Sequence, residues 1–417
     1  MKKRIIICMI LFVFTGILYS NSVFLFNGPV DLSVNRDTHG EGMGGTGSGD
    51  LFRINTSFVN PALSTTINRV YFATALSMGN IHYRDREHNT FRDDQIYLPY
   101  FNFVVPFRER HRIGFTYHTI SSGKLEIEGM VDTEFGLSKE EHRASFSLYN
   151  AGFFYANAND LVNFGIGLNF VLGHQVQFFK QELGQGYAVS SFEADHVFRN
   201  PTFNIGLARA LDRFSTGLAY SFPVDLKGEK RYKTNTINEV IDKSPYEYPA
   251  QIVIGLTYRA HDSLYFSSDI DIQMWENTDN FDDAINSYRA GLGVSWGGVS
   301  RSRNFFARLP LRAGVSFRNL PFELNPARPG EFRPLDRFHR NYKIYETAYH
   351  FGLSFPLRRQ DSYLDFALKI FNRGDADKHR FEESGFLLSI GTQGFDILRR
   401  PLNRKAPRDI PVPDGRN

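Results

Sequence analysis

The sequence predicts an all-β fold, a transmembrane antiparallel β-barrel of about 14 strands. Three observations support this fold class: an export leader at the N-terminus, segments that alternate between apolar and small or charged residues, and connectors that alternate between long and short. A segment inside the barrel and a basic tail complete the expected organisation.

The first 22 residues are typical of a secretory signal peptide. Three basic residues precede an apolar run over 5–18, which is shorter than the roughly 20 residues that a membrane-spanning helix needs. Cleavage is expected after Ser20 or after Ser22. The single cysteine, Cys8, lies inside this leader, so the mature chain can form no disulfide and no thiolate metal site.

Composition favours strands and tight turns. The chain contains 40 Phe, 20 Tyr and 35 Gly, and its mean hydropathy of -0.32 is compatible with a barrel because only alternate strand residues face lipid. The net charge of +3 gives no indication of a nucleic-acid partner.

Period-2 alternation predicts strands of about 9 to 11 residues. The expected strands lie near 70–79, 96–105, 112–119, 146–155, 162–172, 200–209, 213–222, 249–259, 263–275, 286–297, 309–318, 346–355, 361–371 and 384–393.

The alternation is clearest in the second half of the chain. Ile254 and Leu256 share one face of their predicted strand, whereas Val253, Gly255 and Thr257 share the other. The segments near 288–296, 311–318 and 349–355 follow the same rule, with one lipid-like face and one small or charged face. A soluble β-sandwich would also alternate, so this pattern alone does not decide the solvent.

Connector lengths favour the membrane barrel. The long connectors are predicted at 80–95, 120–145, 173–199, 223–248, 276–285, 319–345 and 372–383, and the intervening ones are short apart from an intermediate one at 298–308. Long loops at one end and short turns at the other are typical of barrels in the outer membrane of Gram-negative-type bacteria.

Four regions follow from these observations: a leader over 1–22, a glycine-rich plug over 23–68, the barrel over 69–395, and a basic, proline-containing periplasmic tail over 396–417.

Charged residues on the predicted inner faces of the strands form a candidate site in the lumen. They could satisfy one another inside a wet barrel, or they could steer solutes and contact the plug, and both interpretations stay open. Charges on the lipid face would cost a few kcal/mol each. The expected lumen-lining residues are Arg112, Asp269, Asp271, Arg289, Arg312, Arg318, His350, Asp365 and Lys369.

Motifs for catalysis and cofactor binding are lacking, so the sequence predicts no enzyme and no cofactor. A third possibility, a barrel hydrolase, has no supporting motif in this sequence. His82, Asp85, Glu87 and His88 gather in the first predicted long loop, where they form either a divalent-cation site or, more simply, a solvated charged loop.

Several motifs together resemble the FadL-like outer-membrane transport family, which includes long-chain fatty acid and hydrocarbon channels and PorV-like members. Residues 42–46 and 60–63 are similar to the glycine-rich stretch and Asn-Pro-Ala motif of the family's hatch, and 251–275, 309–318 and 351–383 are similar to its hairpins. The resemblance covers essentially the whole mature chain. It implies a 14-stranded barrel and assigns as hatch residues Gly44, Gly45, Asn60, Pro61 and Ala62.

The resemblance also implies a function and partners. A hydrophobic small molecule such as a long-chain fatty acid would enter the lumen and leave sideways into outer-membrane lipid. The rival prediction is a PorV-like scaffold that binds secreted proteins. The stretch 383–390 could serve as a signal for the barrel assembly machinery. The chain departs from the family at Leu63, where glycine is usual, and in its basic tail.

Overall fold

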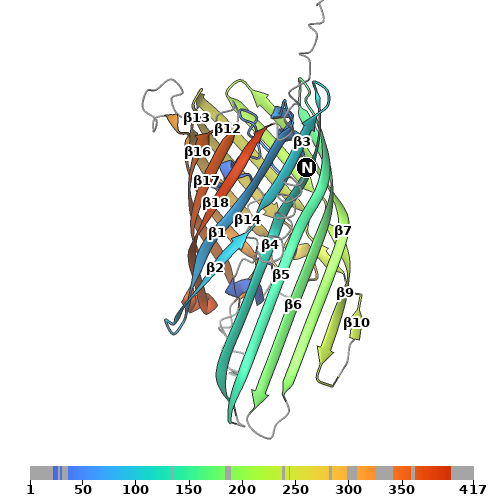
Figure 1. The fold of residues 1–417 in the computed structure, drawn as a ribbon, viewed down its shortest axis with the longest axis vertical. Coiled ribbons are helices and arrows are strands. Elements are labelled where there is room, and N and C mark those ends of the chain that lie inside the picture. Colours follow the sequence, from blue (N-terminus) through green and yellow to red (C-terminus); the bar gives the residue numbers. More distant parts are fainter. Residues whose placement is uncertain are drawn as a thin grey trace, which may run out of the picture.

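The computed structural model describes residues 22–26, 29–30, 36–133, 136–183, 189–236, 240–243, 245–280, 284–297, 308–324, 341–357 and 362–395. Its strands form one antiparallel barrel (Figure 1). The strands are β1 (Tyr71–Asp85), β2 (Thr90–Tyr97), β3 (Tyr100–Pro106), β4 (His111–Thr133), β5 (Gly136–Asn157), β6 (Asn163–Leu183), β7 (Ser190–Leu211), β8 (Phe214–Ser221), β9 (Val224–Thr234), β10 (Val240–Asp242), β11 (Tyr246–Tyr248), β12 (Gln251–His261), β13 (Leu264–Gln273), β14 (Ser287–Trp296), β15 (Leu311–Leu324), β16 (Tyr342–Pro356), β17 (Tyr363–Gly374) and β18 (Phe381–Phe395).

These 18 segments make 14 barrel strands, because three of the barrel strands are each divided into shorter segments. β2 and β3 together form one barrel strand, β8 and β9 form another, and β10 to β12 form a third. Pro99, Pro223 and Pro249 stand at three of the interruptions. Proline has no N–H to donate to a ladder, so each one ends the local pairing.

The barrel closes between its first and last strands. β1 pairs with β18 from Tyr71 opposite Phe395 to Asp85 opposite Phe381. The predicted fold class, a closed antiparallel barrel of 14 strands, is confirmed.

The apolar face of the strands points outward. Ile254 and Leu292 are 49% and 60% exposed, whereas Val253 and Thr257, on the inward face of β12, are 0% exposed. A soluble sandwich would bury its apolar face, so this arrangement decides between the two solvents that alternation left open.

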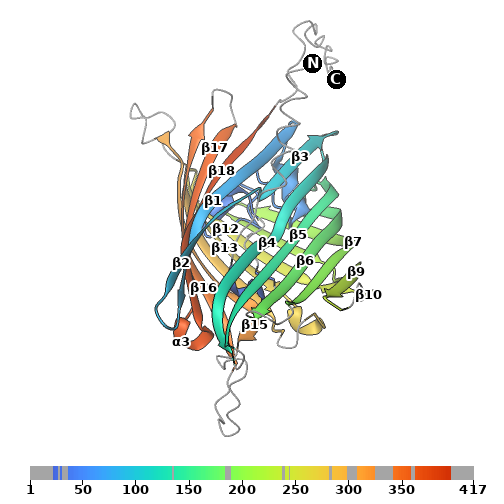
Figure 2. The ribbon, with the colours of Figure 1, turned by 60° about the horizontal axis from the view of Figure 1, so that its bottom comes forward.

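Four strands are much longer than predicted. β4, β5, β6 and β7 contain 23, 22, 21 and 22 residues, so the predicted long loops at 120–145 and 173–199 are wrong and consist mainly of strand. Most of 80–95 and 223–248 is strand as well. β4 to β7 and β9 therefore continue beyond the barrel as a protruding sheet (Figures 1 and 2).

We call the opposite end, where β7 meets β8 and β12 meets β13 through two-residue turns, the short-turn rim.

Short helices complete the described part of the chain: η2 (Val23–Phe26), α2 (Thr38–Glu41), η3 (Pro61–Thr66), η4 (Trp275–Asn277) and α3 (Ala376–His379). No helix among the described residues is both long and apolar enough to cross a bilayer. α2 and η3 belong to residues 36–68, which lie inside the barrel (Figure 2). The predicted tail and residues 1–21 of the predicted leader lie outside the described residues.

The barrel wall is interrupted between β2 and β4. β3 pairs with β4 from Pro106 opposite Arg112 to Tyr100 opposite His118, and one further backbone hydrogen bond, from the N–H of Thr119 to the carbonyl of Pro99 at 2.9 Å, ends the ladder. Beyond it, β2 forms a ladder with β1 alone and β4 with β5 alone, among the described residues. The two strands run apart (Figure 1). We call this interruption the β2/β4 seam.

Candidate functional site: the lumen and its N-terminal segment

A belt of inward-facing glycines receives the backbone of residues 38–62. A Cβ on any of these glycines would lie closer than 3.0 Å to an atom of that segment. At six of these glycines the close atom belongs to the backbone of the segment, and at Gly206 and Gly391 it belongs to the side chains of Asn60 and Thr38, so the wall has no room for a side chain at these positions. The glycine belt consists of Gly165, Gly206, Gly217, Gly255, Gly291, Gly293, Gly314 and Gly391.

Buried ion pairs fasten the same segment to β13 and β14. Arg36 donates from Nε to Asp269 Oδ2 at 3.2 Å and from Nη2 to Asp271 Oδ1 at 2.9 Å. Arg289 donates to the other oxygen of Asp271 at 2.5 Å. Asp269 also accepts the backbone N–H of Ser48 at 2.9 Å. Three of the sequence-predicted lumen residues therefore meet around Arg36.

The predicted hatch motif links the segment to the opposite wall. Asn60 donates its side-chain amide to the carbonyls of Ser48 at 3.0 Å and Leu207 at 3.2 Å. It also caps η3 by accepting the N–H of Ala62, and Pro61 occupies the first position of that helix, where no N–H is needed.

The two remaining predicted hatch residues, Gly44 and Gly45, have φ of +74° and +67°. This left-handed conformation favours glycine. The turn brings the N–H of Gly45 to the carbonyl of Gly40 at 2.9 Å. Leu63, which departs from the family pattern, is fully buried against Ala208.

Arg312 and Asp365 form a second buried pair, with 3.4 Å between Arg312 Nη1 and Asp365 Oδ1. The guanidinium also contacts the ring of His39 on α2. Burial and the neighbouring guanidinium of Arg312 hold the pKa of His39 well below its usual value. His39 is therefore neutral, and its Nδ1 can accept a hydrogen bond from Arg312.

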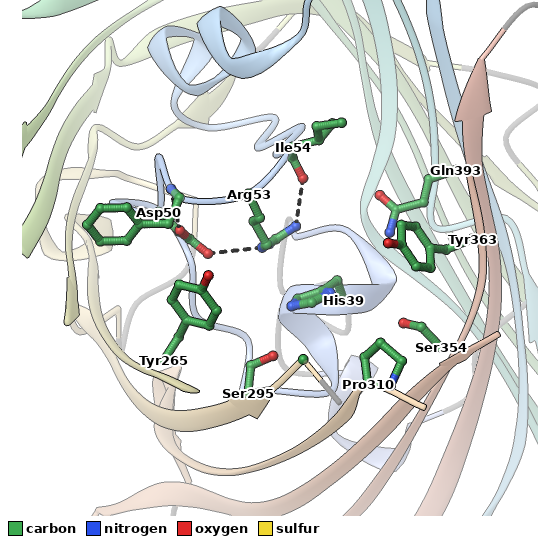
Figure 3. A pocket seen from close by; sticks show the side chains of 12 residues that line it. His39, Asp50, Arg53, Ile54, Tyr265, Ser295, Pro310, Ser354, Tyr363 and Gln393 are labelled. Atoms are coloured by element: carbon green, nitrogen blue, oxygen red, sulfur yellow. Dashed lines mark hydrogen bonds and ion pairs between the residues drawn. The ribbon is translucent and has the colours of Figure 1, made fainter. Parts of the chain in front are cut away.

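A cavity of about 350 Å³ lies between the N-terminal segment and the short-turn rim (Figure 3). Arg53 reaches its wall, but Asp50 at 3.0 Å and Asp37 at 2.7 Å match its charge. The other groups on the wall include Tyr265 and Gln393. The cavity thus offers polar neutral groups rather than an unmatched charge.

A third charged cluster surrounds Glu346 on β16. Arg318 and Lys369 each approach it at 2.8 Å, and Arg373 donates from Nε at 2.9 Å. Arg373 also bridges to Glu383 at 2.9 Å.

Two predicted lumen residues lie apart from these clusters. His350 contacts Ser316 at 2.9 Å, and Arg112 donates to backbone carbonyls, among them that of Ile67, near the short-turn rim.

Residues 22–26 and 29–30 enter an apolar part of the lumen farther from the short-turn rim. Phe24 packs in a cluster that contains inward-facing side chains of β1, β4 and β15 to β17, and Leu25 packs in a cluster on the side of β4 to β9. We call these surroundings the apolar lining: Ile81, Leu125, Leu320, Phe322, Ile344, Phe371, Phe146, Leu148, Phe198, Leu226, Tyr246 and Trp275. Phe371 joins it to the charged cluster, with Lys369 Nζ 5.1 Å from its ring centroid.

Sequence reasoning missed several members of these clusters. Glu346 shares the inward face of β16 with the predicted His350, and Arg373 shares that of β17 with Lys369, so extending the alternation could have found both. Arg36, Asp37 and Arg53 precede the first strand, where no periodic signal exists.

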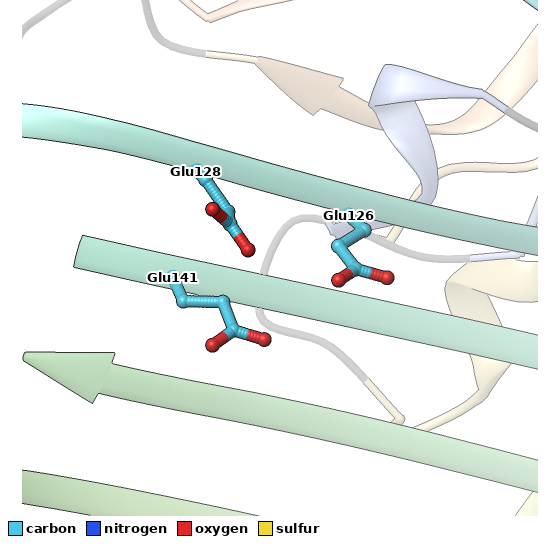
Figure 4. A group of neighbouring side chains, drawn as sticks. All are labelled: Glu126, Glu128 and Glu141. Atoms are coloured by element: carbon cyan, nitrogen blue, oxygen red, sulfur yellow. The ribbon is translucent and has the colours of Figure 1, made fainter. Parts of the chain in front are cut away.

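A group of carboxylates gathers elsewhere, on the protruding sheet. Among the described residues, Glu126, Glu128 and Glu141 bring carboxylate oxygens within 4.8 Å of one another (Figure 4). Lys139 lies 3.1 Å from Glu128, and Arg143 lies 3.3 Å from Glu126. These two cations offset part of the negative charge of the three carboxylates. The predicted cluster around His82 forms no such group, and Asp85 instead accepts the N–H of Asn89 at 2.8 Å.

Comparisons with known proteins agree with this architecture. The FadL homologue of Pseudomonas aeruginosa has 14% identity and a TM-score of 0.57, over 88% of this chain and 99% of that one. The Pseudomonas putida toluene transporter TodX has 15% identity and a TM-score of 0.57, over 85% and 97%. The CymD monoaromatic hydrocarbon channel has 16% identity and a TM-score of 0.56, over 88% and 99%. At these identities the likeness shows the fold.

No curated protein matches the chain. The sequence-predicted resemblance to FadL-like proteins is thus supported at the level of structure, whereas the matching family model is one that the sequence reasoning did not name.

The closed barrel with its outward apolar face and short-turn rim has the architecture of bacterial outer-membrane proteins, and the protein resides in that membrane. The family model named BamG matches residues 1–393. The protein belongs to the BamG family.

Proposed function

We propose that the protein is a channel through which hydrophobic small molecules enter the outer membrane sideways, across the β2/β4 seam. The observation that carries the proposal is that, among the described residues, no ladder joins β2 to β4, because β2 pairs with β1 and β4 pairs with β5. Val30 lies behind the seam: its carbonyl accepts the hydroxyl of Ser121 on β4, and its side chain belongs to the same apolar cluster as Leu125.

The N-terminal segment supports a lateral route rather than an axial one. Backbone contacts with the glycine belt and the buried pairs of Arg36 fix residues 36–66 across the lumen. Opening a path through them would break several buried pairs, each costly to leave half-satisfied. We propose that residues 36–66, the larger part of the predicted hatch over 23–68, stay in place. Phe24, Leu25 and Val30 make mainly apolar contacts and can yield to a ligand of similar character.

The surroundings of Phe371 favour an amphipathic ligand that carries a carboxylate. Arg318, Lys369 and Arg373 meet two carboxylates, those of Glu346 and Glu383, and the apolar lining begins at Phe371. A long-chain fatty acid could place its headgroup near these cations and its tail along the lining. The neutral hydrocarbons named for the similar structures would use the lining alone.

Closing the seam tests the route. Cysteines in place of Ile96 and Ser122 would stand on the two strands just beyond the last ladder pair, and a bifunctional thiol reagent would join them. We expect cross-linking to reduce uptake of a fluorescent long-chain fatty acid at least tenfold. The matched control is Thr74→Cys with Thr392→Cys, which are ladder partners on β1 and β18. Undiminished uptake after complete cross-linking of the seam would contradict the proposal.

The ligand class needs a second measurement. Arg373 is fully buried, so its replacement risks unfolding, and Lys369→Met is the milder change because it keeps the aliphatic stem. We expect this variant to lose fatty acid binding while retaining binding of toluene. Equal loss of both ligands would indicate a general packing defect instead.

A second candidate function is a role in the barrel assembly machinery. The family name is the first support, and the protruding sheet is the second, because strands of 21 to 23 residues exceed the roughly 9 to 11 that cross a membrane. Its outer face carries charges, such as Glu126, Lys139 and Arg143, that suit an aqueous protein surface. A PorV-like role with secreted proteins remains a prediction without such support.

Affinity purification from native membranes tests this second function. We expect assembly proteins to copurify in stoichiometric amounts and to be lost when Lys139 and Arg143 are both changed to Glu. The control changes Arg108 and Arg110, at the short-turn rim, to Glu. Purification of the chain alone under mild conditions would count against this role.

A further inference from the structure

The backbone at the predicted leader boundary meets a buried carboxylate. The N–H of Val23 donates to Glu383 Oε1 at 2.7 Å, and the hydroxyl of Ser22 donates to the same oxygen at 2.7 Å. Glu383 is 0% exposed, and its other oxygen accepts Arg373 at 2.9 Å. One carboxylate oxygen is thus reserved for the chain's own residues at this boundary.

The sequence places a cleavage signal at the same point. Leader peptidases recognise small residues at the first and third positions before the cut. Ser20 and Ser22 stand at those two positions when the cut falls between Ser22 and Val23. Of the two predicted sites, this one makes the nitrogen that already contacts Glu383 the new N-terminus.

We propose that Glu383 is the binding site for the α-ammonium group of the processed chain, which begins at Val23. A leader peptidase hydrolyses the Ser22–Val23 amide: water adds to the carbonyl, Ser22 leaves as a carboxylate, and the nitrogen of Val23 becomes an ammonium group. The neutral N–H donor is thereby replaced by a charged one at the same position, and such charge-assisted hydrogen bonds are roughly twice as strong as neutral ones.

This site gives residues 23–25 a fixed starting point. Phe24 and Leu25 follow the anchored nitrogen directly and enter the two halves of the apolar lining. The inference stands apart from the transport proposal because it concerns the chain's own terminus.

Mass spectrometry of the purified protein tests both parts. The intact mass should correspond to a chain that begins at Val23. An amine-reactive ester applied near pH 7 labels α-amino groups in preference to lysines, because their ordinary pKa is about 7.7–8.0 against about 10.4. In the folded protein we expect the α-amine to react at least tenfold more slowly than after denaturation.

Glu383→Gln should raise the labelling rate of the folded protein toward the denatured rate, because the amide offers no charge to the ammonium group. Glu382→Gln is the control, since Glu382 pairs with Arg84 on the neighbouring strand instead. A mature chain that begins at any residue other than Val23 would overturn the proposal. So would an α-amine in the folded wild type that reacts as fast as in the denatured chain, a result that needs no variant to fold.

Discussion

The backbone nitrogen of Gly49 lies against Gly255 on β12, so closely that a Cβ on Gly255 would overlap it. The contact places the N-terminal segment in the same layer as the barrel backbone. Gly217 on β8 makes an equivalent contact with the carbonyl of Ser48. Gly217 and Gly255 are ladder partners on neighbouring strands, so the wall and the segment fit together there. A substitution in either one should therefore alter the packing of the other.

Replacing Gly255 by Val should destabilise the folded barrel, because the new side chain has to displace backbone rather than a flexible side chain. Overpacking of this kind typically costs about 1–3 kcal/mol. Denaturant titration of the barrel in detergent measures the change. Gly297→Ala is the control, since a Cβ there meets no atom closer than 3.6 Å. Equal midpoints for the two variants would show that the segment yields easily.

Asp269→Asn should destabilise the folded protein strongly, although the two side chains have nearly the same size. The carboxylate accepts both Arg36 and the N–H of Ser48, and removing one partner of a buried pair typically costs about 3–5 kcal/mol. Proteolysis within residues 36–68 should accelerate in the variant. Asp94→Asn tests a pair that is exposed to solvent, with Arg92, where the loss should stay below about 1 kcal/mol. Similar proteolysis in both variants would argue against a fastening role.

Asn60→Ala removes the side-chain bridge between Ser48 and Leu207, so both carbonyls lose the amide donor of Asn60. The loss of such a hydrogen bond typically costs about 0.5–1.5 kcal/mol. We expect a lower unfolding midpoint and faster hydrogen exchange at Ala62, whose N–H loses its cap. Asn89→Ala, in the exposed turn between β1 and β2, should leave both observables unchanged. An unchanged unfolding midpoint for Asn60→Ala would show that Asn60 belongs to an ordinary turn and does not hold the segment against the wall.

The barrel was predictable because its lipid-facing strands obey a local rule. Ile254 and Val253 are adjacent in one strand, and the pleat turns the first outward and the second inward. The period-2 pattern of the sequence shows this difference directly. The same rule failed on the outer parts of β4 and β5. There Glu126 and Glu128 face water instead of lipid, so the apolar half of the alternation disappears although the strand continues.

The lumen was only partly predictable because its partners are far apart in the chain. Asp269 and Asp271 were recognisable as inward charges, but Arg36 reaches them across 233 and 235 residues and lies in no periodic element. The β2/β4 seam was also invisible, since Pro99 marks a break in a strand without indicating which neighbour is lost. Pairing between distant strands is a property of register, which the local pattern does not encode.

Glu41 on α2 should make stability depend on pH near neutrality. Burial raises its pKa from 4.5 to about 7, against a smaller opposing effect of Ser389 and Lys369. The folded state therefore holds a proton more tightly than the unfolded chain does, so this contribution is complete below about pH 4.5 and is lost as the pH rises to about 7. Glu41→Gln cannot ionise. Thermal unfolding between pH 5 and 8 should thus show a steeper decline for the wild type than for the variant, and parallel curves would exclude a titrating role for Glu41.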